Sequence, residues 1–161
     1  MESTMKVGVI SDSHDNVKNL SFAVEYFNRN GADYVIHCGD IVSPFAAEYL
    51  NKLQMPYFGI FGNNDGEWLG LAKITGGKIV KGPLVKEIDG CRFAVFHEPS
   101  VIDYISSDVS YVLYGHTHSK DFTKRDKQTI INPGTLGGYM ADSASFAVID
   151  TDNGKTDFID L

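Results

Sequence analysis

The feature that most constrains the fold is a strand–helix–strand pattern near the start of the chain. Residues 6–10 (KVGVI) form a short, largely β-branched run that predicts a buried strand. Residues 16–28 then place apolar side chains at helical spacing, and residues 34–38 (YVIHC) predict a second strand. Because a helix that joins two neighbouring strands carries the chain back over the sheet, the two strands should pair in parallel. The chain is therefore expected to begin as an α/β fold.

The next segment continues this alternation. Ser43-Pro44 is a favourable N-cap and first-turn pair, and it opens a predicted helix with apolar residues as far as Leu53. Residues 56–61 predict a third strand.

From about Gly76 onward the sequence is typical of strands and turns. Residues 84–88 and 91–96 flank Asp89-Gly90, a dipeptide that suits a two-residue type I′ hairpin turn. We expect the strands of this half of the chain to pair antiparallel. Further strands are predicted at residues 112–114, 122–125, 129–131, 145–149 and 156–159. So many strands in 161 residues favour two packed, mixed β-sheets flanked by helices. The expected fold is a four-layer αββα sandwich, formed by one domain spanning residues 1–161.

Composition narrows the range of partners. The net charge of −7 disfavours non-specific binding to nucleic acid, which requires clustered Lys and Arg. No apolar run approaches the roughly 18 to 20 residues of a membrane helix, and residues 1–4 show no apolar leader. We therefore expect a cytoplasmic protein without a membrane segment, and a homo-oligomer is left open. Cys38 and Cys91 lie in apolar runs and are interpreted as core residues.

Polar residues that can bind cations gather where predicted strands end. They are Asp12-Ser-His14, Gly39-Asp40, Gly62-Asn-Asn-Asp65, His97 and Gly115-His-Thr-His118. Because the carboxyl ends of parallel strands face a common crevice, these side chains should converge. Imidazoles, carboxylates and an amide oxygen make a poor core and a good cation site. His37 differs, since it lies inside a predicted strand, and we expect it to be a hydrogen-bonded structural residue.

The order of these motifs resembles that of the calcineurin-like metallophosphoesterase superfamily. The strings that carry the resemblance are Ser11-Asp12-Ser-His14, His37-Cys-Gly-Asp40, Gly62-Asn-Asn-Asp65, Tyr114-Gly-His-Thr-His118 and Asn132-Pro-Gly134. They span most of the chain and are most similar to the small prokaryotic phosphodiesterase branch. The resemblance implies a metal-dependent hydrolase, above all a phosphodiesterase, that acts on a small phosphate-ester substrate.

The resemblance also implies a centre of two divalent metal ions. One site would consist of Asp12, His14, Asp40 and His118, and the other of Asp40, Asn63, His97 and His116. Two dications roughly 3.5 to 4 Å apart need an anion between them, which Asp40 could supply together with a hydroxide that attacks phosphorus in line. Mixed imidazole and oxygen ligands favour Mn²⁺, Fe²⁺, Zn²⁺, Ni²⁺ or Co²⁺ over Ca²⁺ or Mg²⁺. The resemblance makes Mn²⁺ the first choice.

The chain departs from the superfamily pattern beside the ligand Asn63. Many relatives carry His at the next position, where it can protonate the leaving group, whereas Asn64 cannot act as an acid. We assign Asn64 and Asp65 to this catalytic position, with Asp65 as the nearest residue that could orient an introduced acid. Substrates with good leaving groups should then be favoured. Many relatives also have His-Gly-His where this chain has His97-Glu98-Pro99, and the short stretch that follows is consistent with an open pocket.

Two other functions compete with this interpretation. A member of this fold could serve as a protein-interaction scaffold, as the retromer scaffold subunit resembling this family does, but loss of ligands would then be expected and every ligand type is present. A nuclease of the same superfamily is disfavoured by the acidic balance and the lack of a basic, aromatic stripe, so nucleic acid is expected only as a small nucleotide substrate. The sequence does not specify the natural substrate.

Overall fold

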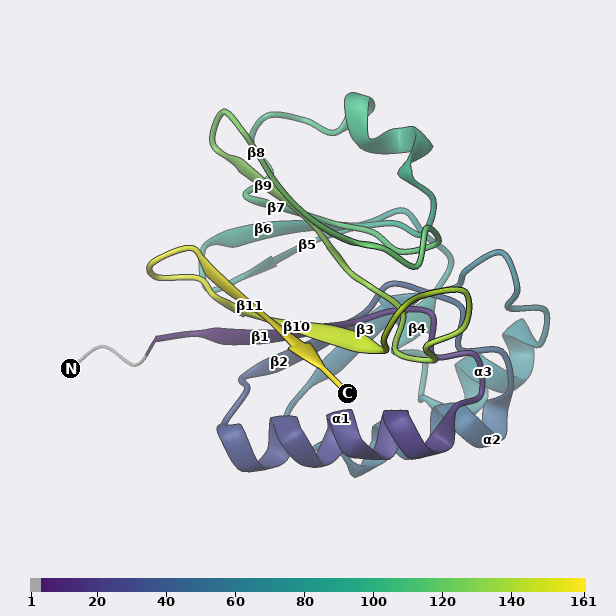
Figure 1. Ribbon diagram of the computed structural model, residues 1–161. Coiled ribbons are helices and arrows are strands. Elements are labelled where there is room, and N and C mark those ends of the chain that lie inside the picture. The colour runs from purple at the N-terminus through teal and green to yellow at the C-terminus, as the bar shows by residue number, and fades with distance from the viewer. Residues whose placement is uncertain (1–3) are drawn as a thin grey trace.

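The computed structural model describes residues 4–161 as two β-sheets packed face to face with helices outside (Figure 1). The first sheet contains β1 (Lys6–Ile10), β2 (Tyr34–His37), β3 (Tyr57–Ile60), β4 (Ile79–Val80), β10 (Ser145–Asp150) and β11 (Lys155–Asp160). The second contains β5 (Leu84–Ile88), β6 (Cys91–Val95), β7 (Tyr111–Leu113), β8 (Lys120–Arg125) and β9 (Gln128–Pro133). The helices are α1 (Val17–Asn30), α2 (Pro44–Ala47), α3 (Trp68–Ile74) and the 3₁₀ helices η1 (Glu48–Lys52) and η2 (Pro99–Tyr104).

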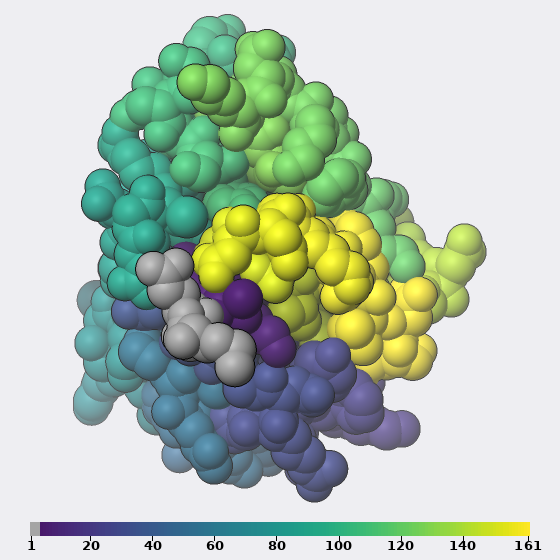
Figure 2. Space-filling model, turned by 90° about the vertical axis from the view of Figure 1, so that its left-hand side faces the viewer, coloured from purple at the N-terminus to yellow at the C-terminus, as the bar shows by residue number. Residues whose placement is uncertain are grey.

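The first sheet has the order β11-β10-β1-β2-β3-β4. Strands β1 to β4 run parallel, as predicted for strands joined by crossover helices, and β10 and β11 add an antiparallel hairpin at one edge. This hairpin is the yellow part of the face shown in Figure 2, between the second sheet above and α1 below. The parallel strands all end on the same side of the sheet, which places the loops that follow them next to one another.

The second sheet, of order β5-β6-β7-β9-β8, mixes both pairing directions. The β5–β6 hairpin turns at Asp89 and Gly90, both at positive φ, in agreement with the predicted turn. The expectation that strands of this half pair antiparallel is wrong for β6, β7 and β9, which pair in parallel. The segment containing η2 crosses over between β6 and β7, and such a crossover restores the parallel direction.

Apolar side chains fill the space between the two sheets and beneath α1. Val9 and Ile36 of the first sheet belong to the same buried cluster as Phe93 and Leu113 of the second. Phe27 and neighbouring side chains of α1 pack against the outer face of the first sheet. Residues of η2 pack against the outer face of the second sheet. The predicted sandwich of two mixed sheets with flanking helices is confirmed, and its fourth layer is the 3₁₀ helix η2.

Three short elements were not predicted: α3, β4 and η2. Each is shorter than the window in which hydrophobic periodicity can be recognised, and Gly70 interrupts the helical pattern of α3. The predicted helix at residues 43–53 is α2 followed by η1.

No helix within residues 4–161 is long and apolar enough to cross a membrane. The leader-free start expected at residues 1–4 lies mostly outside the described residues, because the description begins at residue 4.

Candidate metal centre

The seven predicted metal ligands come from loops at one edge of the sandwich. Asp12 and His14 follow β1, Asp40 follows β2, Asn63 follows β3, His97 follows β6, and His116 and His118 follow β7. Asp12, His14 and His118 form one group of candidate ligand atoms, and Asp12, Asp40 and His97 form a second. His116 and Asn63 extend the second group, since the rings of His97 and His116 lie 5.2 Å apart and His116 Nδ1 is 3.0 Å from Asn63 Oδ1.

In the first group, the ligand atoms have the spacing of atoms that share a cation. Oδ1 of Asp12 lies 3.2 Å from Nε2 of His118 and 3.6 Å from Nε2 of His14. The two histidine Nε2 atoms are 3.3 Å apart. Atoms that bind one ion at about 2.1 Å lie roughly 3 to 4 Å from one another, so these separations fit a common ion.

The second group has the same spacing around His97. Its Nε2 lies 3.3 Å from Oδ2 of Asp40 and 3.8 Å from Oδ1 of Asp12. Oδ2 of Asp40 is also 3.5 Å from Nε2 of His14, so the Asp40 carboxylate reaches both groups as expected for a shared ligand. Asp12, which the resemblance assigns to one site only, lies within the same distance range of both groups.

Unsatisfied polar atoms mark the middle of this cluster. Within residues 4–161, Asp12 Oδ1 and His97 Nε2 are among three buried side-chain atoms that have no hydrogen-bond partner. Burying a carboxylate oxygen and an imidazole nitrogen without partners is costly, unless a cation binds them. The donor set, with imidazole nitrogens, carboxylates and one amide oxygen, is the kind that Mn²⁺, Fe²⁺, Zn²⁺, Ni²⁺ and Co²⁺ accept. The residues therefore fit the metal ions that the sequence implies.

Backbone carbonyl groups orient two of the histidines. Nδ1 of His97 lies 2.8 Å from the carbonyl oxygen of Cys38, and Nδ1 of His118 lies 2.7 Å from that of Tyr139. Since a carbonyl oxygen only accepts, each Nδ1 must carry the proton and donate it. The Nε2 atom of each ring then keeps a free lone pair that points into the cluster, which is the usual arrangement of metal-binding histidines.

Electrostatics keep the carboxylates ionised and favour protons on the neighbouring histidines. Burial raises the pKa of Asp40, but the nearby imidazole of His97 and the hydrogen bonds from Asn64 lower it more, so the pKa lies below its ordinary value. The nearby Asp12 carboxylate raises the pKa of His14 above its ordinary value. For His97, burial lowers the pKa, and the interaction with Asp40 raises it by more. Protons therefore compete with cations for these imidazoles.

Backbone strain is concentrated at the ligands. Five of the seven have positive φ, a conformation that residues with a Cβ seldom adopt: Asp12, His14, Asp40, His116 and His118. Such strain persists only where the surrounding structure enforces it, and it clusters at functional sites.

Glycines in two of the motifs leave room for the ligand carboxylates to lie close to the backbone. A Cβ at Gly62 would overlap Oδ1 of Asp40, and a Cβ at Gly115 would overlap Ser11 and lie 2.6 Å from Oδ2 of Asp12.

The two residues assigned to the catalytic position have different surroundings. Asn64 lines the hollow over the centre, and its Nδ2 donates a 2.8 Å hydrogen bond to Oδ2 of Asp40. Asp65 is 3% exposed, and its carboxylate accepts hydrogen bonds from the backbone N–H groups of Asp40, Val42 and Gly62. Asp65 thus ties the loop after β3 to the loop after β2, and burial raises its pKa.

His37 is buried and lies behind the ligand loops. Its Nδ1 accepts the backbone N–H of Gly39 at 3.0 Å, so its Nε2 carries the proton that faces the Ser13 hydroxyl at 3.0 Å. The predicted structural role agrees with this placement.

Sequence reasoning missed several residues that support Asp12. The Ser11 hydroxyl donates a 2.6 Å hydrogen bond to Oδ2 of Asp12, and the Thr135 hydroxyl donates to the Asp12 carbonyl at 2.9 Å. Ser11 belongs to one of the strings that carry the resemblance, but no role was assigned to it from the sequence. Thr135 lies far along the chain, and nothing in the sequence links it to Asp12.

Two hollows adjoin the centre. One, of about 410 Å³, is lined by His14, Asp40, Asn63, Asn64, His116, His118, Tyr139 and Met140. The other, of about 320 Å³, shares Asn63 with it and is also lined by His97 and Trp68.

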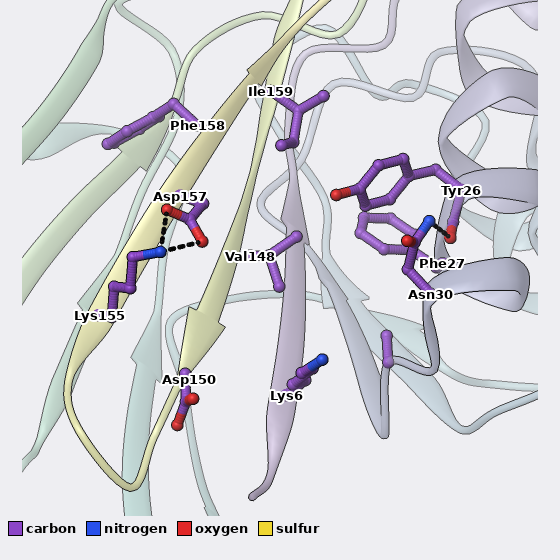
Figure 3. Close-up of a pocket in the computed structure, with 11 residues that line it drawn as sticks. Lys6, Tyr26, Phe27, Asn30, Val148, Asp150, Lys155, Asp157, Phe158 and Ile159 are labelled. Atoms are coloured by element: carbon purple, nitrogen blue, oxygen red, sulfur yellow. Dashed lines mark hydrogen bonds and ion pairs between the residues drawn. The ribbon is translucent and has the colours of Figure 1, made fainter.

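A larger hollow, of about 510 Å³, lies elsewhere, between the end of α1 and the β10–β11 hairpin (Figure 3). Its charged groups include Lys155 and Asp157, which pair with each other, and none of the predicted ligands lines it. The chemistry is therefore expected at the strand ends, away from this hollow.

A family model described as the calcineurin-like phosphoesterase superfamily domain matches residues 5–154. The chain belongs to this superfamily. It is 35% identical over 158 residues to phosphodiesterase MJ0936 of Methanocaldococcus jannaschii, a match that covers 92% of this chain and 94% of the relative. The solved structure of a novel archaeal phosphodiesterase superposes with a TM-score of 0.91 at 34% identity, covering 98% of this chain and all of the other.

A solved structure of lower sequence identity shares the fold. Wild-type Vps29 of Entamoeba histolytica, solved with Zn²⁺, superposes with a TM-score of 0.69 at 16% identity and covers 98% of each chain. At that identity the likeness concerns the fold alone. The predicted family, fold and hydrolase class are confirmed: this calcineurin-like phosphoesterase is a metal-dependent enzyme acting on phosphate esters.

Proposed function

We propose that the chain hydrolyses small phosphodiesters with two divalent cations held by the seven strand-end ligands. The observation that carries this proposal is the pair of buried, unpartnered atoms, Asp12 Oδ1 and His97 Nε2, in the middle of the ligand cluster. The relative named as a phosphodiesterase supports the substrate class.

The ligands divide as the resemblance implies. Asp12, His14, Asp40 and His118 would hold one ion, and Asp40, Asn63, His97 and His116 would hold the other. Mn²⁺ is the ion we propose, with Ni²⁺, Fe²⁺, Zn²⁺ and Co²⁺ as alternatives that suit the same donors. When bound, such ions hold phosphate oxygens and make water nucleophilic near neutral pH.

The protein's own contribution is to hold the ligands in place. Carbonyl groups fix the rings of His97 and His118, and Asn64 fixes Asp40. Because Asn64 has no titrating proton, no acid stands at that position to protonate a leaving group. Aryl esters, whose phenolate departs without help, should therefore react faster than alkyl esters.

Two hollows that share Asn63 in their lining favour diesters over monoesters. A diester carries two organic groups, so each hollow can accept one of them while the phosphate lies at the ligands.

The experiment compares metal content and hydrolysis of bis(p-nitrophenyl) phosphate in three proteins reconstituted with Mn²⁺. The wild type should bind close to two ions per chain and turn over the ester. Asp40→Asn should weaken both ions and abolish turnover, because Asp40 reaches both ligand groups. Asp152→Asn removes the same charge from an exposed turn beside the start of β1, at the end of the strand opposite to the ligands, and should behave as wild type.

Saturation of the wild type at one ion would overturn the two-ion centre. Loss of only one ion from Asp40→Asn, with activity retained, would show that Asp40 is not shared. A chain that binds no ion and hydrolyses no ester would instead favour the scaffold role. Cytoplasmic location, a homo-oligomeric state and the extent of the single domain stay predictions.

A further inference from the structure

Trp68 presents an aromatic surface next to the metal centre. Its side chain is 46% exposed although it stacks on Phe61, with ring centroids 5.4 Å apart and planes only 7° from parallel. Trp68 begins α3, which lies at the end of the first sheet where the ligand loops gather (Figure 1). Stacking on Phe61 fixes the indole plane, so the exposed surface has a defined orientation.

The hollow that contains Trp68 begins at the predicted ligands. Its lining includes Asn63 and His97 together with Phe61 and Trp68. A phosphate held by the cluster could therefore extend one ester group directly into this hollow. Its volume of about 320 Å³ is at the lower end of the range for small-ligand sites.

The remaining lining combines apolar residues, among them Pro83, Phe96 and Val101, with polar groups that carry charges of both signs. Lys81 places its Nζ 5.7 Å from the centre of the Trp68 ring, and Glu98 and Ser100 line the same hollow. An ammonium group, a carboxylate and a hydroxyl offer donors and acceptors beside an aromatic face. A heteroaromatic ring that stacks on Trp68 could also form hydrogen bonds with these polar groups, which a purely hydrocarbon ester group could not.

We infer that this hollow is a subsite for the nucleobase of a nucleoside phosphate ester, with Trp68 as its stacking platform. The inference rests on the proposed phosphodiesterase function and narrows its substrate class to small nucleotides. Every base has a π-face that can stack on an indole, so an aromatic platform binds bases with little sequence preference. The net charge of −7 and the small volume restrict the ligand to a mononucleotide or dinucleotide, not a long polynucleotide.

Two ligands that differ only by the base test this inference. Adenosine 5′-monophosphate and ribose 5-phosphate are measured as competitive inhibitors of bis(p-nitrophenyl) phosphate hydrolysis. The ratio of their inhibition constants measures the contribution of the base to affinity, because both ligands contain the phosphate and the sugar. Base stacking is worth roughly five- to a hundredfold in affinity. The wild type should therefore bind the adenosine ligand about tenfold or more tightly than the sugar phosphate.

Three variants test whether Trp68 causes the preference for the ligand that carries a base. Trp68→Ala should bring the ratio close to one, and Trp68→Phe, which keeps an aromatic face and the contact with Phe61, should retain part of it. Tyr104→Ala is the matched control, since Tyr104 is 86% exposed and lies outside both hollows beside the centre. It should keep the wild-type ratio.

A second measurement does not depend on turnover. The chain has a single tryptophan, so its fluorescence reports on Trp68 alone. Titration with adenosine 5′-monophosphate should quench this fluorescence, and ribose 5-phosphate should not. A wild-type ratio near one, or equal quenching by both ligands, would overturn the nucleobase subsite even if the ester is hydrolysed. Failure of the proposed function would be recognised separately, by the absence of hydrolysis in the Mn²⁺-loaded wild type.

Discussion

The side chain of Asn64 donates a 2.8 Å hydrogen bond from Nδ2 to Oδ2 of Asp40, and the Asn64 backbone N–H donates a second, also of 2.8 Å, to Oδ1. The residue that stands where many relatives carry an acid therefore holds the ligand that reaches both ligand groups. These bonds help to keep Asp40 ionised, against the effect of burial, which raises its pKa. We propose that Asn64 acts by positioning Asp40.

Asp65→Asn should lower stability and metal affinity together. The Asp65 carboxylate accepts three backbone N–H groups, and an amide of the same shape would turn an NH₂ group towards some of these donors. A mismatch of this kind costs about 1–3 kcal/mol in unfolding free energy. Urea unfolding and Mn²⁺ titration would measure both effects, with Asp152→Asn as the control. If activity fell while stability and metal content were unchanged, Asp65 would act directly in catalysis.

Gly62→Ala should weaken metal binding at the centre, whereas Gly66→Ala in the same loop should leave it unchanged. A Cβ at Gly62 would overlap the Asp40 carboxylate, and a Cβ at Gly66 meets nothing within 4 Å. Overpacking of this kind costs about 1–3 kcal/mol, so Mn²⁺ affinity should fall by roughly tenfold or more in the first variant only. Isothermal titration with Mn²⁺ compares the two. Equal affinities would show that the loop moves to accommodate the methyl group.

The sequence predicted that the ligands would converge, because each motif follows a recognisable strand and the strands were expected to be parallel. A strand end is recognisable from a few residues, and parallel strands must end at one edge, so the motifs alone place Asp12, Asp40 and Asn63 side by side. The second half was harder. The parallel pairing of β6 with β7 depends on a crossover through η2, whose six residues have too little periodicity to predict a helix.

The support of the ligands was also beyond sequence reasoning. The bonds from Thr135 to Asp12 and from His118 to Tyr139 join segments that are far apart in the chain. Asp65 was assigned near the chemistry because it is adjacent to Asn64 in sequence. Adjacent residues can face opposite directions, and the carboxylate of Asp65 is turned into the protein.

His37 should make stability depend on pH between about 4 and about 6.5. Burial lowers its pKa to about 4, and its Nδ1 accepts the Gly39 N–H, so the folded protein keeps the ring neutral. The unfolded chain takes up a proton below its ordinary pKa of about 6.5. The unfolded state binds more protons than the folded state in this range. The contribution of His37 to the free energy of unfolding is therefore complete above about pH 6.5 and is lost as the pH falls towards 4. The full effect is about 3 kcal/mol.

Urea unfolding at several pH values, with a chelator present so that metal release adds nothing, measures this dependence. His37→Asn keeps an acceptor for the Gly39 N–H but cannot titrate, so its stability should fall less steeply between pH 6.5 and 4. Parallel curves for the two proteins would show that other groups cause the acid sensitivity.

Asn64→His should supply the acid that many relatives carry, and its effect should depend on the leaving group. An alkoxide needs a proton to depart, whereas a phenolate does not, so the new imidazole should help alkyl esters most. General acid catalysis is typically worth roughly 10² to 10⁴-fold. Only part of this is expected, because the substitution also removes the Nδ2 hydrogen bond to Asp40, and because Asp65, occupied by backbone N–H groups, is not free to orient the ring.

Asn64→Ala separates the two consequences, since it loses the same hydrogen bond without gaining an acid. The measurement is kcat/KM for a series of diesters graded by leaving-group pKa, on the wild type and both variants with equal Mn²⁺ content. We expect Asn64→Ala to be slower than wild type for every ester by a similar factor, because a less firmly held Asp40 affects all substrates alike. We expect Asn64→His to show a shallower dependence on leaving-group pKa than either. Equal slopes in all three proteins would mean that protonation comes from elsewhere or does not limit the rate.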